Sequence, residues 1–248
     1  MKKYSTIIFD LFDTIVNFNF NHLPNIELNG FRSRTTSIEV YEVFKKYYPE
    51  ITFAEFYQPF MDSYHEFQDL KLKEYREFPN SRRFEIMLGK MRLSRIEDKT
   101  ELENKMVLAH MNALSSCVEF PEENRSILEY VQKEGFKMAI VSNFDYAPTA
   151  YDLIDKFEIR NLFEVIIISG DVGWRKPKDI IFRIAIDNLA IEADEALFVG
   201  DNYNADVIGS KSVGMDAVWI NRRNETDEGL EVKPDFIIKN FYELRNIV

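Results

Sequence analysis

The feature that most constrains the fold is a regular alternation of helix-like and strand-like segments from Pro121 to the C-terminus. Helical periodicity and a stop at Gly135 predict helices over 122–134, 151–157 and 178–189, and a short helix ending at Gly214. Apolar runs predict the intervening strands at 137–142, 163–169, 196–200, 216–220 and 235–239. Strict alternation of this kind predicts an α/β fold with a doubly wound parallel sheet.

A different pattern occupies residues 17–117, where apolar residues recur at helical spacing, as in Phe84, Met87, Leu88 and Met91. This segment is predicted to be a bundle of helices. It follows the short apolar run 6–9, which has the character of a buried strand of the same sheet. We therefore expect an α/β core domain formed by residues 1–16 and 118–248, with residues 17–117 inserted as a helical domain.

Polar residues stand at the predicted ends of four strands. They are Asp10, Ser142 with Asn143, Lys176 beyond the strand at 163–169, and Asp201 after a glycine. A single strand-end Asp can be a helix cap or a turn former. Capping gives no reason for all of these groups to converge, whereas in open parallel sheets ligands bind at the carboxyl ends of the strands. The pattern predicts a binding or catalytic site there.

The acidic residues of "GDNYNAD", Asp201 and Asp206, are spaced so that both can lie beside Asp10. Three carboxylates without a cation would repel one another, whereas Mg²⁺ prefers carboxylate oxygens and water. We expect Asp10, Asp201 and Asp206 to bind Mg²⁺. Lys176 is the expected counter-charge to the nucleophile and to a bound anion, while its neighbour Arg175 is expected to be solvated.

Composition excludes several other classes of function. A net charge of -11 and a pI near 4.9 oppose binding to nucleic acid. The longest apolar runs are too short to span a membrane, and we expect a soluble cytoplasmic protein, either a monomer or a homodimer. A single cysteine, Cys117, allows no internal disulfide, and three scattered histidines do not have the spacing of a zinc site.

The motifs "FDLFDT", "VSN", "KP" and "GDNYNAD", in this order, resemble the four signature motifs of the haloacid dehalogenase (HAD) superfamily of hydrolases. The resemblance covers the core from Thr6 to Trp219, and the inserted helical domain lies where the superfamily has its cap. It implies that Asp10 is a nucleophile forming a covalent aspartyl intermediate, that Ser142 binds the transferring group, and that Lys176 holds both. It also implies metal ligation by the side chains of Asp10, Asp201 and Asp206 and by the main-chain carbonyl of Phe12, and substrate contacts by Asn143, Phe12 and Thr14.

Phe12 departs from the phosphatase pattern of the superfamily, which has a second Asp two residues after the nucleophile as general acid and base. Positioned acid–base catalysis contributes about 10²- to 10⁴-fold. An aromatic residue there resembles the dehalogenases themselves, whose halide leaving group needs no proton, although their fourth motif differs. Asp13 stands where the superfamily commonly has Gly. It either supplies the missing acid after a rearrangement or, as we favour, stabilises the turn after the first strand.

The acidic cluster outweighs Phe12, because buried acids are costly unless something pairs with them. The sequence therefore predicts a Mg²⁺-dependent phosphatase acting on a small phosphorylated metabolite with a good leaving group, such as an acyl or aryl phosphate. The alternatives are a hydrolytic 2-haloacid dehalogenase and a weakly active phosphate-binding regulatory protein.

The predicted cap gives less information about the substrate. Most of its aromatic residues are expected in the core of the helical bundle, including Phe53, Phe56, Tyr57, Phe60, Tyr64 and Phe67. The segment "GFRSRTT", residues 30–36, is expected to be a loop at the entrance in which Arg32 or Arg34 either meets an anionic substrate or is solvated. Hinges for opening the cap are expected near Asn17 and Cys117.

Overall fold

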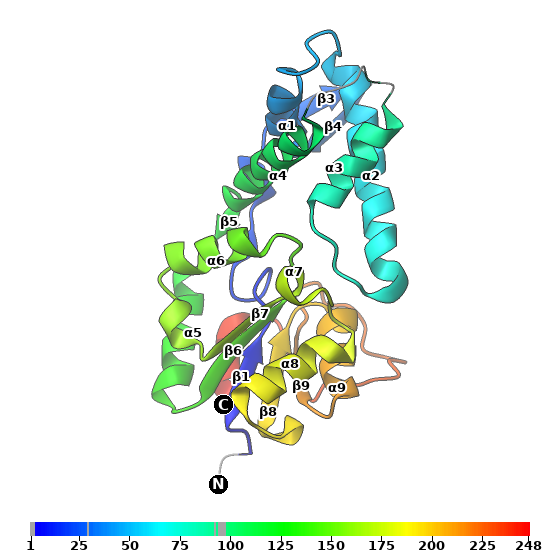
Figure 1. Cartoon of the computed structure of the whole chain (residues 1–248). Coiled ribbons are helices and arrows are strands. Elements are labelled where there is room, and N and C mark those ends of the chain that lie inside the picture. Colours follow the sequence, from blue (N-terminus) through cyan, green and yellow to red (C-terminus); the bar gives the residue numbers. More distant parts are fainter. Residues whose placement is uncertain (1–2, 29, 92, 94–97) are drawn as a thin grey trace. The chain divides into compact units, whose positions relative to one another are not determined.

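The main sheet of the computed structural model is parallel and has six strands, in the order β10-β9-β8-β1-β6-β7 (Figure 1). The strands are β1 (Thr6–Phe9), β6 (Lys137–Ser142), β7 (Val165–Ile168), β8 (Ala196–Gly200), β9 (Asp216–Ile220) and β10 (Phe236–Ile238). The first strand, β1, lies inside the sheet and pairs with β6 and β8. The α/β class and the doubly wound parallel sheet predicted from the sequence are confirmed.

The structure describes residues 3–28, 30–91, 93 and 98–248. The chain divides into two units. The core unit comprises Met1–Phe18 with Glu119–Val248, and the inserted unit comprises Asn19–Val118. The sequence predicts these boundaries between residues 16 and 17 and between residues 117 and 118.

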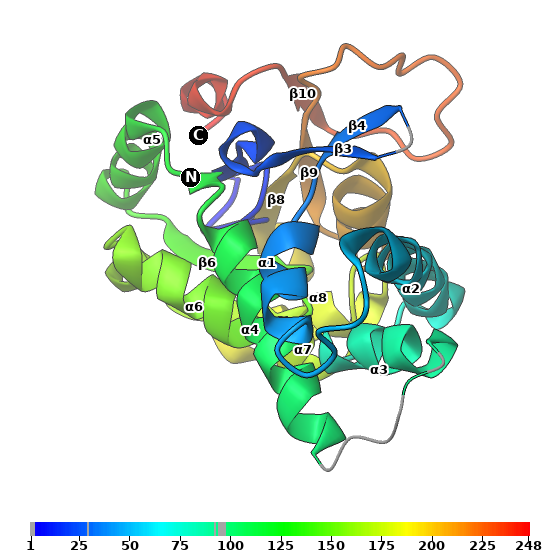
Figure 2. The ribbon, with the colours of Figure 1, turned by 90° about the horizontal axis from the view of Figure 1, so that it is seen from above.

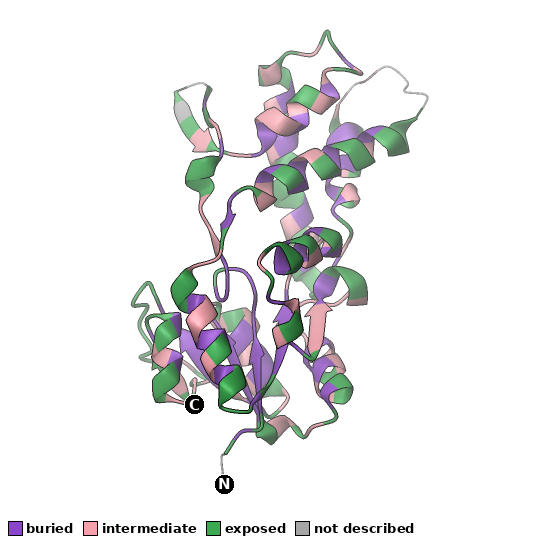
Figure 3. Cartoon of the chain, turned by 90° about the vertical axis from the view of Figure 1, so that its left-hand side faces the viewer, coloured by how far each residue is buried: buried purple, intermediate pink, exposed green. Residues whose placement is uncertain are grey.

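Helices cover both faces of the sheet in the core unit (Figure 2). Apolar side chains of α8 (Asp179–Leu189), among them Phe182 and Ala185, pack on Ile8 and Ala139. On the other face the ring of Phe9 packs against that of Phe241, from the 3₁₀-helix η5 (Phe241–Asn246), with centroids 5.7 Å apart. Successive residues of a strand point to opposite faces, so Ile8 and Phe9 serve the two layers. The inner strands are buried (purple in Figure 3).

The remaining elements of the core unit include the predicted helices at 122–134 and 151–157 and the short helix before Gly214, together with short elements that the sequence pattern does not predict. They are β2 (Asn17–Phe18), α5 (Glu122–Lys133), α6 (Ala147–Lys156), η2 (Arg160–Leu162), α7 (Ser169–Val172), η3 (Ala193–Glu195), the π-helical turn η4 (Tyr203–Ile208) and α9 (Gly209–Ser212). Helix α6 begins four residues earlier than predicted. Its Pro148 lies in the first turn, where the absence of an N–H group costs no helical hydrogen bond.

The described residues of the inserted unit form four α-helices and a hairpin. The helices are α1 (Ser37–Phe44), α2 (Phe53–Glu74), α3 (Ser81–Lys90) and α4 (Lys99–Ser115), together with η1 (Phe20–His22) and the strand residue Val118 of β5 (Val118–Glu119). Thr52 and Glu55 form a capping box at the start of α2. None of the helices in the described parts of the chain is long and apolar enough to cross a membrane.

The segment expected as an entrance loop is instead strand β4 (Phe31–Arg34), antiparallel to β3 (Asn25–Leu28). Gly30 has φ of +79°, which the turn between the strands requires and glycine adopts without strain. Arg32 forms an exposed ion pair with Glu27, with Nε 2.9 Å from Oε2. Arg34 donates to the main-chain oxygen of Leu23 at 2.7 Å. The expectation of a loop was therefore wrong, and both guanidinium groups have partners inside the inserted unit.

The aromatic residues of α2 are less uniformly buried than predicted. Phe56, Phe60 and Phe67 are buried, but Tyr64 is 41% exposed. On α4, Leu108 is 48% exposed, although Met106 and Met111 of the same helix are buried. A stripe read from spacing alone includes its border positions, and these lie at the edge of the packed face.

Candidate active site

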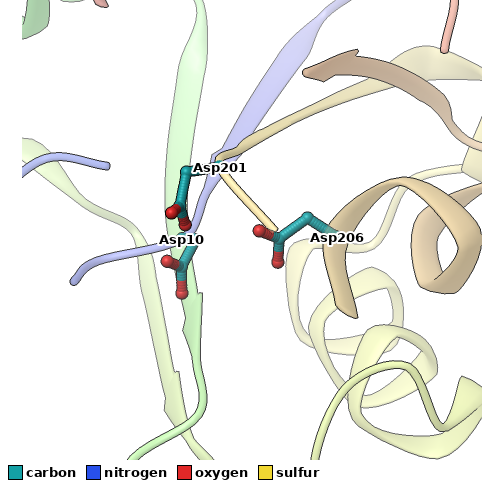
Figure 4. A group of neighbouring side chains, drawn as sticks. All are labelled: Asp10, Asp201 and Asp206. Atoms are coloured by element: carbon teal, nitrogen blue, oxygen red, sulfur yellow. The ribbon is translucent and has the colours of Figure 1, made fainter. Parts of the chain in front are cut away.

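Three carboxylates converge at the carboxyl ends of β1 and β8 (Figure 4). One ligand oxygen from each of Asp10, Asp201 and Asp206 lies within 4.8 Å of the others. The N–H group of Asp10 donates to the main-chain oxygen of Val199 at 2.9 Å, so the β1–β8 pairing continues into the site. Because parallel strands end at the same edge of the sheet, β1 and β8 bring together residues about 190 positions apart.

The main chain at residues 200–202 lies very close to the carboxylate of Asp206. A Cβ atom on Gly200 would lie 2.3 Å from Asp206 Oδ2, so any other residue there would clash with the carboxylate. The N–H group of Asn202 donates to the same oxygen at 2.9 Å. Asp206 lies in the π-helical turn η4, and turns of this kind are frequent at functional sites. The indole of Trp219 donates to the main-chain oxygen of Asp201 at 3.0 Å and so holds the chain directly after β8.

Lys176 joins the cluster as its cation. Its Nζ atom lies 2.8 Å from Asp10 Oδ1 and 2.7 Å from Asp206 Oδ1, and the side chain is almost fully buried. Burial opposes the charged ammonium, but the negative charges of Asp10 and Asp206 and their hydrogen bonds outweigh it. The pKa of Lys176 is therefore raised above its ordinary value. The buried lysine stays cationic and faces the proposed nucleophile.

One cation does not balance three carboxylates. Burial and the charges of Asp10 and Asp206 raise the pKa of Asp201 to about 8, and burial also raises the pKa of Asp206 to about 6. Without a metal, the site therefore retains protons that an ordinary carboxyl group would have lost. A hard divalent cation replaces such protons with charge, and the all-oxygen donor set suits Mg²⁺. The residues present thus fit the metal predicted from the sequence.

We predict that Mg²⁺ stabilises the protein more as the pH rises. Because folding raises the pKa of Asp201 from 3.8 to about 8, the metal-free folded state binds more protons than the unfolded chain in that interval. Its free energy of unfolding should therefore fall as the pH increases through this range. Mg²⁺ removes this penalty, so the increase in Tm on adding Mg²⁺ should be largest near the upper end. Thermal unfolding with Mg²⁺ and with a chelator checks this, and a Tm increase independent of pH would contradict it.

Two of the predicted site residues carry buried hydroxyl groups. Ser142, at the end of β6, and Thr14 have exposures of 1% and 0%. Within the described part of the chain, neither Ser142 Oγ nor Thr14 Oγ1 has a hydrogen-bond partner. A buried hydroxyl without a partner costs free energy, and such groups in native proteins call for an explanation. For Ser142, a bound oxyanion would supply the missing partner.

Phe12 is the middle ring of a three-ring stack. Its centroid lies 5.0 Å from that of Phe18 and 4.6 Å from that of Phe144, with interplanar angles of 13° and 28°. Both faces of the Phe12 ring are thus covered, and the side chain is 9% exposed. The stack joins the turn after β1 to the loop after β6. Where the phosphatase pattern has an acid, this chain has a packing residue that closes the turn.

Asp13 lies in the same turn with φ of +55°, the left-handed conformation that Asp and Asn tolerate better than most residues. Its Oδ1 atom accepts a hydrogen bond from the N–H group of Phe18 at 3.1 Å. Arg222, beyond the end of β9, donates to the main-chain oxygen of Asp13. These contacts favour the structural role of Asp13 over a role as the acid.

We predict that Asp13→Asn retains activity within about threefold, because asparagine keeps the acceptor oxygen and tolerates the left-handed conformation. Steady-state kinetics with an aryl phosphate measures the effect. If Asp13 were the general acid, the same substitution would reduce kcat by about 100-fold or more. Asp13→Ala serves as the control for loss of the turn, and its main expected effect is a lower Tm.

Several residues that hold the site were not identified from the sequence. Asn124 of α5 donates to the main-chain oxygen of Ile15 at 2.8 Å and so ties down the turn after β1. Phe144, Trp219 and Arg222 act through stacking or main-chain contacts. No spacing rule marks such residues, since their partners are main-chain atoms or rings distant in the sequence. The aromatic at position 144 was visible only as the residue after "VSN".

Two proteins that are similar to this chain in sequence are phosphatases by name. The glyceraldehyde 3-phosphate phosphatase of Pyrococcus abyssi is 30% identical over 161 residues, which are 64% of this chain and 65% of that protein. The protein of the same name from Pyrococcus furiosus is 28% identical over 197 residues, 76% of this chain and 77% of that protein. The match to the first of these relatives thus spans just under two thirds of its length.

A solved structure shares the fold. The HAD phosphatase from Thermococcus onnurineus has a TM-score of 0.66 at 23% identity, covering 98% of this chain and 97% of that chain. Residues 4–214 match the family described as haloacid dehalogenase-like hydrolase. The match includes all four motifs noted in the sequence, and the resemblance is confirmed: the chain belongs to the haloacid dehalogenase-like hydrolase family.

Proposed function

We propose that the protein is a Mg²⁺-dependent phosphatase that uses Asp10 as a nucleophile on a small phosphorylated metabolite. The observation that carries the proposal is the convergence of Asp10, Asp201, Asp206 and Lys176 at one edge of the sheet. This arrangement supplies a nucleophile, a metal-ligand set and a buried cation for an anionic substrate. The names of the two Pyrococcus relatives agree with a phosphorylated substrate of low molecular weight.

The side chains support a two-step displacement. A carboxylate oxygen of Asp10 forms a bond to phosphorus while the bond from phosphorus to the leaving oxygen breaks. Water then attacks the phosphorus of the aspartyl phosphate, which releases phosphate and restores Asp10. Lys176 orients Asp10 and offsets the charge of the transferring group, and the hydroxyl of Ser142 donates to one of its oxygens. Bound Mg²⁺, held by Asp10, Asp201, Asp206 and the Phe12 carbonyl, would add further charge stabilisation.

The first step lacks a donor at position 12 for the proton that the leaving oxygen requires. Phe12 is enclosed between the rings of Phe18 and Phe144, so a small shift of the turn cannot bring an acidic side chain into its place. The leaving oxygen must therefore depart nearly as an anion. Substrates whose leaving groups are weakly basic, such as acyl and aryl phosphates, suit this site best.

We predict a steep dependence of kcat on the basicity of the leaving group, with aryl phosphates hydrolysed far faster than sugar phosphates. Phe12→Asp should accelerate simple alkyl phosphates most, within the range of about 10²- to 10⁴-fold for general acid catalysis. Phe12→Asn is the matched control, because it opens the ring stack equally but cannot donate a proton as an acid. If kcat of the wild type depended only weakly on leaving-group basicity and that dependence became steep in Asp13→Asn, Asp13 would be identified as the acid instead.

A screen for activity, with and without Mg²⁺, across phosphate esters, acyl phosphates and 2-haloacids tests the proposed function. We expect Mg²⁺-stimulated release of phosphate. Metal-independent release of halide would favour the hydrolytic dehalogenase, for which Phe12 is the supporting observation. Labelling of Asp10 in a single burst, without steady-state turnover, would favour a phosphate-binding regulatory protein.

A further inference from the structure

The side-chain amide of Asn143 is bound on both sides to the main chain of one residue, Lys176. The Nδ2 atom donates to the main-chain oxygen of Lys176 at 3.0 Å, and the N–H group of Lys176 donates to Oδ1 at 2.8 Å. The amide therefore pairs with Lys176 as a neighbouring strand would, although the two residues are 33 positions apart. Oδ1 and one of the two N–H donors of Nδ2 are thus engaged with the main chain.

Lys176 requires a contact that fixes its main chain. It lies in the segment 173–178 between α7 and α8, outside any helix or strand. Its Nζ atom must nevertheless meet Asp10 and Asp206 at the same time, at 2.8 and 2.7 Å. The lysine side chain has many rotamers, so its head is placed accurately only if its main chain is fixed. The two hydrogen bonds from Asn143 supply that constraint.

The loop that carries Asn143 is itself fixed to the start of α7. The N–H group of Phe144 donates to Ser169 Oγ at 2.8 Å, and the N–H group of Gly170 donates to the main-chain oxygen of Phe144 at 3.0 Å. A Cβ atom on Gly170 would lie 2.9 Å from that oxygen, so the close approach requires glycine. The loop that holds Asn143 is thus fixed in place directly after Ser142, the last residue of β6.

We propose that Asn143 is a positioning residue that fixes the place of the Lys176 ammonium group relative to Asp10. Its side chain does not itself contact the substrate. This inference rests on the phosphatase function proposed above. It revises the substrate contact that the family resemblance assigns to Asn143. Loss of the amide should displace the ammonium group, weaken its contact with Asp10 and leave the affinity for substrate nearly unchanged.

The test compares Asn143→Ala and the bulkier Asn143→Leu with the wild type, using an aryl phosphate in Mg²⁺. Asn221→Ala is the matched control, because Asn221 makes the same pair of bonds with the main chain of Glu225, at 2.8 and 2.9 Å. Misplacement of a catalytic group by about 1 Å costs about 100-fold. We expect kcat to fall by about 10- to 100-fold in both Asn143 variants, with KM changed by less than about threefold. Asn221→Ala should retain the wild-type kcat.

Crystal structures of the same variants give a second measurement that does not depend on activity. The expected result is a displaced main chain at Lys176, with Nζ no longer within hydrogen-bond distance of Asp10. A variant in which Lys176 stays in place, or in which KM rises while kcat is retained, would overturn the positioning role. If the wild type hydrolyses no phosphate ester, the proposed function fails, and the crystal structures alone still decide whether Asn143 positions Lys176.

Discussion

Asp10→Asn is expected to reduce turnover by about 10⁴-fold or more while the protein remains folded, because an amide oxygen cannot attack phosphorus effectively. The substitution keeps the size of the side chain and its place at the end of β1. It also removes one of three mutually repelling carboxylates, so the Tm measured in a chelator should not fall greatly. Steady-state kinetics on an aryl phosphate, with circular dichroism for the fold, measures both effects.

Asp179→Asn is a suitable control for the Asp10 variant. Asp179 lies at the start of α8, and its carboxylate forms an exposed ion pair with Arg183 at 3.2 Å. Exposed pairs of this kind contribute little to stability, and we expect wild-type kinetics. Substantial activity in well-folded Asp10→Asn, above the level of any contaminating phosphatase, would exclude Asp10 as the nucleophile.

Removing Mg²⁺ with a chelator is expected to reduce activity to background, and restoring it should recover the full rate. Without the metal, Asp201 retains its proton near neutral pH, because its pKa is raised to about 8, and Asp206, with a pKa raised to about 6, loses its proton later than an ordinary carboxyl group. The site is then unable to offset the charge of a phosphoryl group with Lys176 alone. Activity measured against Mg²⁺ concentration gives the apparent affinity.

Asp201→Asn sharpens this experiment. Asp201 is not an ion-pair partner of Lys176 among the described contacts, so the substitution weakens the ligand set while the lysine keeps Asp10 and Asp206. We expect a lower apparent affinity for Mg²⁺ and partial recovery of kcat at high concentration. Full activity of the wild type in excess chelator would contradict the phosphatase proposal and favour the dehalogenase.

The sequence predicts the core fold well, because its strands are short apolar runs and most of them are joined by helices of clear periodicity. The hairpin β3–β4 was missed, although an Asn-Gly pair at 29–30 between apolar residues is a hairpin signal. The polar residues on either side, such as Asn25 and Arg32, concealed it. The start of α6 was missed because Pro148 was not recognised as a first-turn residue.

Four of the predicted site residues, Asp10, Asp201, Asp206 and Lys176, lie together because parallel strands end at one edge of the sheet. Their supporting contacts could not be foreseen. Whether Asn143 faces a substrate or the main chain of Lys176 depends on the path of a loop that no periodicity specifies. Likewise, a phenylalanine at position 12 reads as a lost acid in the sequence, and only the structure shows that its ring is stacked between Phe18 and Phe144.

The central claim is that Asp10 carries the phosphoryl group during turnover. A rapid acid quench of the enzyme during hydrolysis of an aryl phosphate in Mg²⁺, followed by peptide mass mapping, tests it directly. The account predicts a phosphoryl group on the peptide that contains Asp10, formed at least as fast as kcat and absent in Asp10→Asn. Steady release of phosphate with no phosphorylated Asp10 at any time, or a phosphoryl group on another residue, would contradict it.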